Sequence, residues 1–275
     1  GAPNAREGIV VAWLPPGVTV PATISDAEPF VLSKREIRGQ VSNGMLASPR
    51  ELGISDEHEG ILEIKAVDVG SDLTKPGTPF KKLYGLEDTV IDCENKMFTH
   101  RPDCFGILGV AREIAGIQQL SFKSPDWYTA EPEFDQVNDL DLEISIADET
   151  LCSRLMAVAM KDVVVAPSPL WLQSALSRVG LKPINNIVDL TNYYMYLTGQ
   201  PIHAYDYDKL KAESTHEPVV VARAASKGEK IALLNGKTLE LEPGTLIIST
   251  DVTPVAIAGI MGGSETEVDQ NTKNI

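Results

Sequence analysis

The sequence predicts an α+β protein made of several small domains within 275 residues. Three observations predict this class. Short alternating segments between tight turns fill the first part, helical spacing of apolar residues recurs in the middle, and a hairpin signal with apolar strand runs fills the last part. Together they predict a partial β-barrel, a small α/β connector, and a mixed α+β domain with an antiparallel sheet.

The first predicted domain covers residues 1–64. Its expected strands are residues 9–13, residues 31–38 and Met45–Leu46, separated by Pro and Gly turn signals. Short strands with tight turns are typical of a small β-barrel or of part of one.

A small connector follows over residues 65–122. Within it, residues 103–117 carry apolar residues at helical spacing and predict a helix that ends near Gly116. Residues 123–140 are acidic, contain Pro and have no periodicity, which predicts a linker between domains.

The last predicted domain covers residues 141–275. Residues 141–148 alternate strictly and predict a strand, and a second strand is expected over 153–165. Ser168–Pro169 starts a predicted helix that stops at Gly180, and a second helix is expected over 186–194. Asn235–Gly236 predicts a type I′ hairpin within 231–241, followed by strand runs at 246–250 and 255–263.

Composition restricts the class of protein. The net charge is −15, and Lys34, Arg35 and Arg38 form the one basic cluster of the first 65 residues; such a cluster is more often a solvated face than a binding patch. If the protein binds RNA, other parts of a larger assembly must supply much of the attraction. The sequence has no apolar run of about 20 residues and no signal peptide. Its three cysteines lack CxxC spacing, which predicts reduced thiols. We therefore expect a cytoplasmic protein.

Two stretches are candidates for a functional site. The first, residues 188–206, holds Thr191, Asn192 and His203 around a Gly-Gln-Pro turn that would let them face one cleft, although a single His is more often a structural residue. The second, residues 256–263, has three glycines within five residues. These would admit a ligand, or they would end a strand that packs tightly on a neighbour.

Several catalytic motifs are missing from the sequence. It has no GxxxxGK[ST] loop, HExxH or GxSxG. Cys104 precedes a predicted helix, where the pKa of its thiol could fall, but a structural thiol is the favoured interpretation.

Six segments carry a resemblance to one family. NNIVDLTNYYMYLTGQPIHAYDYDKL (185–210), PVAIAGIMGGSETEV (254–268) and SPLWLQSALSRVGLKPIN (168–185) resemble the editing domain of bacterial phenylalanyl-tRNA synthetase β subunits, and THRPDCFGILGVAREIAG (99–116) resembles the preceding segment. GAPNAREG (1–8) and IRGQVSNGMLASPRELGI (37–54) resemble the latter part of the family's OB-like tRNA-binding domain. The resemblance therefore covers nearly the whole chain.

The resemblance implies a role in an (αβ)₂ heterotetramer that charges tRNA(Phe). ATP and Mg²⁺ would belong to the whole enzyme, with no cofactor in this chain, and the β subunit would hydrolyse tyrosyl-tRNA(Phe). Such editing is needed because an apolar pocket rejects an isostere with one more hydroxyl only weakly.

Carried over by motif position, the resemblance gives five residues a role. Thr191, Asn192, Ala258 and Gly259 would bind the tyrosine moiety, and a bulky residue at Gly259 would block the pocket. His203 would orient water or the ester, with no residue acting as sole general base.

We expect this chain to be a fragment, because it does not start with Met and because the family's glutamate for the tyrosine hydroxyl would follow Ile275. Two rival hypotheses stay open: a non-catalytic tRNA- or protein-binding module with a relic pocket, and a free-standing editing hydrolase.

Overall fold

The computed structural model describes residues 2–69, 74–131 and 138–275. Contacts between residues divide the chain into two compact units, one of residues 1–94 with 168–184, the other of residues 95–167 with 185–275. The mixed α+β class predicted from the sequence is confirmed, while the domain boundaries stay a prediction. Part of the predicted linker, residues 132–137, lies outside the described residues.

The first unit consists of short strands and short helices. Its elements are β1 (Trp13–Leu14), η1 (Pro21–Thr23), β2 (Arg35–Ile37), β3 (Gln40–Ser42), β4 (Met45–Leu46), α1 (Ala66–Val69), η2 (Phe80–Lys82) and α4 (Leu170–Arg178). Strands β1 and β4 pair antiparallel, as do β2 and β3, and the residues described contain no closed barrel. The OB-like barrel predicted over residues 1–64 is therefore not confirmed.

The core of the first unit joins segments that are far apart in sequence. Buried Ala12, Ala47, Ile54 and Leu62 pack in one cluster that also includes Leu170 of α4. The N–H of Leu62 donates to the carbonyl of Ala47 (2.8 Å), and the N–H of Ala47 donates to that of Ala12 (3.0 Å). Apolar burial thus holds together strands that are too short to be stable alone.

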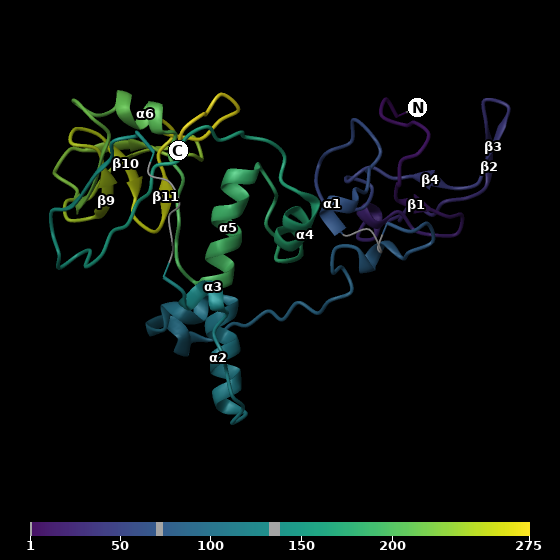
Figure 1. Ribbon diagram of the computed structural model, residues 1–275, viewed down its shortest axis with the longest axis horizontal. Helices are drawn as coiled ribbons and strands as arrows, with labels where there is room; N and C mark the ends of the chain where they lie inside the picture. The colour runs from purple at the N-terminus through teal and green to yellow at the C-terminus, as the bar shows by residue number, and fades with distance from the viewer. Residues whose placement is uncertain (1, 70–73, 132–137) are drawn as a thin grey trace. The chain divides into compact units, whose positions relative to one another are not determined.

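The second unit combines a sheet with several helices (Figure 1). Its helices are η3 (Lys96–His100), η4 (Pro102–Phe105), α2 (Ile107–Ile117), α3 (Asp126–Thr129), α5 (Asn186–Thr198) and α6 (Tyr207–Ala212). Its strands are β5 (Glu143–Ile146), β6 (Val219–Ala224), β7 (Lys230–Ala232), β8 (Thr238–Glu240), β9 (Leu246–Ser249), β10 (Pro254–Ile257) and β11 (Met261–Gly262).

The main sheet has the order β11-β10-β9-β6-β5. All its neighbours are antiparallel except β5 and β6, which run parallel. Helix α6 covers the sheet, because Leu210 packs with Val220 of β6 and Val255 of β10 (Figure 1). The sheet predicted for residues 141–275 is thus mainly antiparallel with one parallel edge.

Two expected elements differ from the structure. The residues described contain no strand over 153–165. Met160 and Val163 instead form backbone hydrogen bonds with residues 273–275, and these bonds are too few for a strand ladder.

The hairpin β7–β8 does not use a type I′ turn. Such a turn needs a positive φ at both Asn235 and Gly236, but of these two residues only Gly236 has one (77°). The N–H of Gly236 donates to the Leu233 carbonyl, which makes a type I turn followed by a glycine bulge.

Helix α5 is longer than predicted because its end signal lies at Gly199. The Asn185 side chain caps the start by accepting from the N–H groups of Ile187 (3.1 Å) and Val188 (3.0 Å). Gly199 ends the helix with φ 78°, and its N–H donates to the Met195 carbonyl.

Candidate functional site

His203 lies in the extended segment between α5 and α6, and its imidazole packs directly on Gly262 of β11. A Cβ placed at Gly262 would overlap with Cε1 and Nε2 of the ring and would lie 3.2 Å from Cδ1 of Leu234. The ring of Tyr205 meets the imidazole edge to face, with centroids 4.6 Å apart and planes at 77°. The fold thus brings together the two stretches that sequence reasoning selected.

This environment disfavours the charged form of the imidazole. His203 retains exposed surface, but the protein around its ring desolvates the charged form and lowers the pKa from the ordinary value of 6.5. Burial likewise raises the pKa of the Tyr205 phenol. At pH 7 the His203 ring can therefore accept a hydrogen bond from water through its unprotonated nitrogen.

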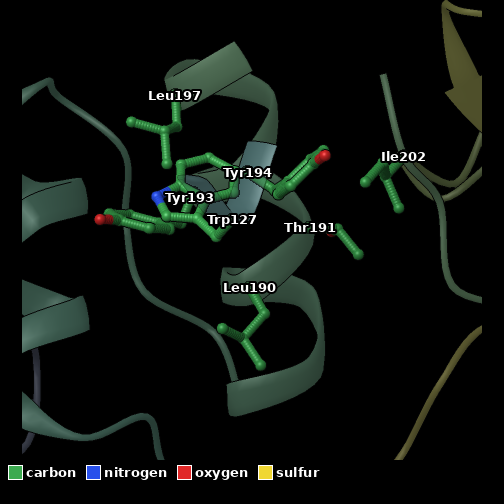
Figure 2. A pocket seen from close by; sticks show the side chains of 7 residues that line it. All are labelled: Trp127, Leu190, Thr191, Tyr193, Tyr194, Leu197 and Ile202. Carbon is green, nitrogen blue, oxygen red and sulfur yellow. The ribbon is translucent and has the colours of Figure 1, made fainter. Parts of the chain in front are cut away.

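Thr191 lies on α5 beside an aromatic hollow of about 520 Å³. Its hydroxyl donates to the Val188 carbonyl (2.7 Å), which is the local back-bond expected for a helical Thr. Figure 2 shows the side chains that line the hollow along α5, with Ile202 entering from the segment beyond the helix. The lining residues are Trp127, Leu190, Thr191, Tyr193, Tyr194, Leu197 and Ile202.

Asn192 follows Thr191 and is half-buried, but it does not line this hollow. Its side chain forms no hydrogen bond within residues 2–69, 74–131 and 138–275. Its predicted role in substrate binding stays a prediction.

Ala258 and Gly259 form the turn between β10 and β11. The N–H of Ala258 donates to the Leu246 carbonyl (3.1 Å), and the N–H of Ile260 donates to the Ile257 carbonyl (3.0 Å). Gly259 has φ 69° and no atom within 4 Å of a Cβ placed on it. Position 259 therefore favours glycine because of the backbone conformation of the turn. Gly262, in contrast, is the glycine that a side chain approaches closely.

The structure places some of the predicted site residues in contact with one another or at the hollow, and others at neither place. His203 contacts the glycine stretch at Gly262, and Thr191 lines the hollow. Asn192, His203, Ala258 and Gly259 are not among the residues that line it, so the predicted pocket stays a prediction. Five residues of this region were not predicted as site residues: Trp127, Tyr193, Tyr194, Leu197 and Tyr205. Tyr193, Tyr194 and Leu197 lie on α5, Tyr205 lies between α5 and α6, and Trp127 comes from the predicted linker.

The remaining candidates in the described residues are weaker. Burial and the nearby Asp103 carboxylate raise the pKa of the Cys104 thiol, which favours the structural interpretation. Within the described ranges, no group of three or more His, Cys, Asp or Glu side chains is arranged to hold a metal ion. In the same ranges no helix is both long and apolar enough to span a bilayer.

Comparison with known proteins supplies the family. Residues 151–275 match the B3/4 domain family. Over all of its residues the chain is 39% identical to the "Phenylalanine--tRNA ligase beta subunit" of Carboxydothermus hydrogenoformans, and 38% identical to the proteins of that name from Moorella thermoacetica and Syntrophus aciditrophicus. The chain spans 32% of the length of each of these relatives. Over the whole of its sequence, it is therefore similar to bacterial phenylalanine–tRNA ligase β subunits.

Proposed function

We propose that this chain carries an editing module that hydrolyses tyrosyl-tRNA(Phe). The observation that carries the proposal is the packing of the His203 ring on Gly262, where the two candidate stretches of the sequence meet. A neutral imidazole beside a glycine-lined strand can hydrogen-bond a water or the ester of an aminoacyl group.

In the proposed hydrolysis the protein binds the tyrosine and orients the reacting groups. A water molecule attacks the ester carbonyl, the bond to the ribose oxygen breaks, and the terminal ribose hydroxyl shares in the proton transfer. His203 orients the water or the ester, and Thr191, Asn192, Ala258 and Gly259 bind the tyrosine. A second, hydrolytic site is needed because an apolar pocket for phenylalanine rejects tyrosine, with its one added hydroxyl, only weakly.

The proposal extends to the larger assembly. Residues 1–64 would form part of an OB-like tRNA-binding domain, and the partners would be an α subunit in an (αβ)₂ enzyme and tRNA(Phe). ATP and Mg²⁺ would serve aminoacylation in that whole enzyme, and we give this chain no step that uses them.

The test is deacylation of tyrosyl-tRNA(Phe) by the full-length protein assembled with its α partner. His203→Ala should slow hydrolysis roughly tenfold to a hundredfold. His216→Ala is the matched control, because His216 is an exposed imidazole of the same unit with no place in the proposed site. Charging with phenylalanine, measured in parallel, checks that both variants fold and assemble.

A second candidate function is a non-catalytic binding module with a relic pocket. It is favoured by the finding that only Thr191, of the five proposed site residues, lines the hollow of α5. If the parent enzyme charges phenylalanine but leaves tyrosyl-tRNA(Phe) intact, the module binds and does not edit.

A further inference from the structure

Packing, and not hydrogen bonding, holds the imidazole of His203. Within residues 2–69, 74–131 and 138–275 its ring nitrogens form no hydrogen bond. The ring lies against Gly262, with Leu234 beside the same glycine, and against the ring of Tyr205. In many functional histidines a hydrogen bond to one ring nitrogen fixes the orientation of the imidazole. Here the neighbouring side chains must fix it instead.

The Tyr205 ring is itself anchored in the core of the second unit. It packs against the buried cluster that joins α6 to strands β6 and β10. The main chain beside it is also held, because the next residue, Asp206, is buried and its carboxylate caps α6 by accepting from the N–H of Lys209 (3.0 Å). Side chains packed in a core keep to few positions. The Tyr205 ring can therefore serve as a fixed support for the imidazole.

The geometry of the two rings fixes an angle as well as a place. The centroids of His203 and Tyr205 lie 4.6 Å apart, and the ring planes meet at 77°. Aromatic rings favour this edge-to-face arrangement because the positive edge of one ring meets the negative face of the other. A leucine at position 205 would fill part of the same space, but it has no flat ring that could select an angle.

The hydroxyl of Tyr205 is not needed for this contact. It forms no hydrogen bond in the part of the chain that the structure describes. Burial raises the pKa of the phenol, so Tyr205 carries no charge at pH 7. The aromatic ring alone therefore acts on the imidazole, and phenylalanine at this position would keep the contact.

We propose that Tyr205 is a positioning residue, which holds the His203 imidazole at the angle from which it orients the water or the ester. The role in hydrolysis rests on the proposed editing function, whereas the placement of the ring rests on the packing. Tyr205 acts through His203 and needs no contact of its own with the substrate. Loss of the Tyr205 ring should therefore lower kcat and leave KM unchanged.

The kinetic test is deacylation of tyrosyl-tRNA(Phe) by the full-length protein assembled with its α partner. Tyr205→Leu should lower kcat about tenfold and keep KM within about twofold of the parent value. Tyr205→Phe should restore the kcat of the parent. Equal losses in the two variants would mean that the hydroxyl acts, and an unchanged kcat in Tyr205→Leu would mean that the imidazole needs no support. Either result overturns the proposal.

A double-mutant cycle tests whether Tyr205 acts through His203. In a His203→Ala background there is no imidazole to displace, so Tyr205→Leu should lower kcat no further. Tyr207→Leu is the matched control for lost packing, because Tyr207 is buried in the same unit and its hydroxyl donates to the Asp141 carbonyl (2.6 Å). This control should keep the parent kcat. A tenfold loss from Tyr205→Leu without the imidazole would show a general structural role and refute the proposal.

The pH dependence of kcat is a readout that lost stability alone would not move. Desolvation by the surrounding protein lowers the pKa of His203, and no charged group of the described residues adds to this effect. Leucine covers less of the imidazole, so Tyr205→Leu should raise that pKa toward 6.5 and move the acid limb of the kcat profile to higher pH. Tyr207→Leu should leave the limb in place. An unmoved limb in Tyr205→Leu would contradict the proposal.

A measurement without hydrolysis separates this proposal from the editing proposal. In the 275-residue chain, labelled with ¹³C at its four histidines, the Cε1–H signal of His203 should sense the ring current of Tyr205. Tyr205→Leu should shift this signal, and Tyr205→Phe should leave it near the parent position. If the parent enzyme does not hydrolyse tyrosyl-tRNA(Phe) but the signals behave in this way, the editing proposal fails and Tyr205 still positions the ring. The same signal in both variants would overturn the positioning, even in an enzyme that edits.

Discussion

At the scale of single residues, the contact between His203 and Gly262 determines where the imidazole lies. The ring occupies the space that any side chain at Gly262 would need, with Leu234 closing the same space from the β7–β8 hairpin. Tyr205 holds the ring on another side. The position of the imidazole thus depends on the absence of a Cβ at Gly262.

We expect Gly262→Ala to displace the His203 ring toward solvent. The desolvation that lowers the pKa of His203 would then decrease, and the pKa should rise toward 6.5. Titration of the imidazole Cε1 signal by NMR measures this directly. The substitution should also lower the free energy of unfolding by about 1–3 kcal/mol, since it overpacks a buried strand.

Gly116→Ala is the control for this substitution. Gly116 lies in α2 with no atom within 4 Å of an added Cβ and with no positive φ, so the change should leave the pKa of His203 untouched. If Gly262→Ala also leaves that pKa unchanged, the contact does not position the ring.

The sign of the pH dependence follows from this burial. The unfolded chain takes up the His203 proton at a higher pH than the folded chain does, so the folded state loses stability as pH falls below about 6.5. The loss ends once pH passes below the folded pKa. Gly262→Ala should narrow this window, which makes its stability less sensitive to pH over the same range.

The candidate residues could be predicted only to a limited extent. Thr191 and His203 stood out from the sequence through the motifs around them, and the glycine stretch signalled close approach. Which glycine a side chain approaches could not be predicted, because the segment before α6 and strand β11 are about sixty residues apart and meet only through the folded sheet.

At the scale of elements, the junction between α2 and α5 depends on two glycines. A Cβ at Gly106 would overlap the backbone of Thr198 and Gly199, and a Cβ at Gly199 would lie 2.5 Å from the Pro102 carbonyl oxygen. Backbone meets backbone here, so neither helix end has a flexible side chain that could move aside.

Gly106→Ala should therefore separate the two helix ends or strain them. We expect the free energy of unfolding to fall by about 2–3 kcal/mol, measured by urea denaturation. Gly116→Ala, in the same helix α2, should instead be neutral or stabilising by up to about 1 kcal/mol, because Ala has the higher helix propensity. Similar effects of the two substitutions would show that helix propensity, and not the close approach, governs this junction.

Element types followed from local sequence better than element ends and pairings did. Asn185 caps α5 through hydrogen bonds to neighbouring residues, and Pro169 directly precedes α4 without a side-chain cap. Both helices have local start signals and were predictable from the sequence. The strand expected over 153–165 depends on pairing with a distant segment, and that pairing is only partial. The turn at Asn235–Gly236 was assigned to type I′ from the dipeptide alone, although Leu234 enters the loop and changes its length.

At the scale of the whole molecule, the division of the chain into units was the least predictable feature. Residues 168–184 lie between two segments of the second unit, yet Leu170 packs in the core of the first. Nothing in the local pattern of this helix says which core its apolar face joins, because any apolar face satisfies the same periodicity.

The net charge of −15 is also a property of the whole molecule, and it acts against the compact state. Raising the salt concentration from 0.01 M to 0.15 M shortens the Debye length from roughly 30 Å to about 8 Å. Repulsion between separated carboxylates is then strongly screened. The charged atoms of an ion pair such as Arg223–Glu229 are 2.7 Å apart, which is much shorter than either Debye length. Added salt therefore weakens the attraction within such pairs less than it weakens the long-range repulsion.

We therefore expect added NaCl to raise the melting temperature at pH 7 by about 2–4 °C, which corresponds to roughly 1 kcal/mol for a chain of this size. Differential scanning calorimetry measures the shift. At pH 4.7, near the sequence pI of about 4.7, the same salt should have little effect because the net repulsion is gone. A melting temperature that falls with salt at pH 7 would mean that ion pairs contribute more to stability than repulsion removes.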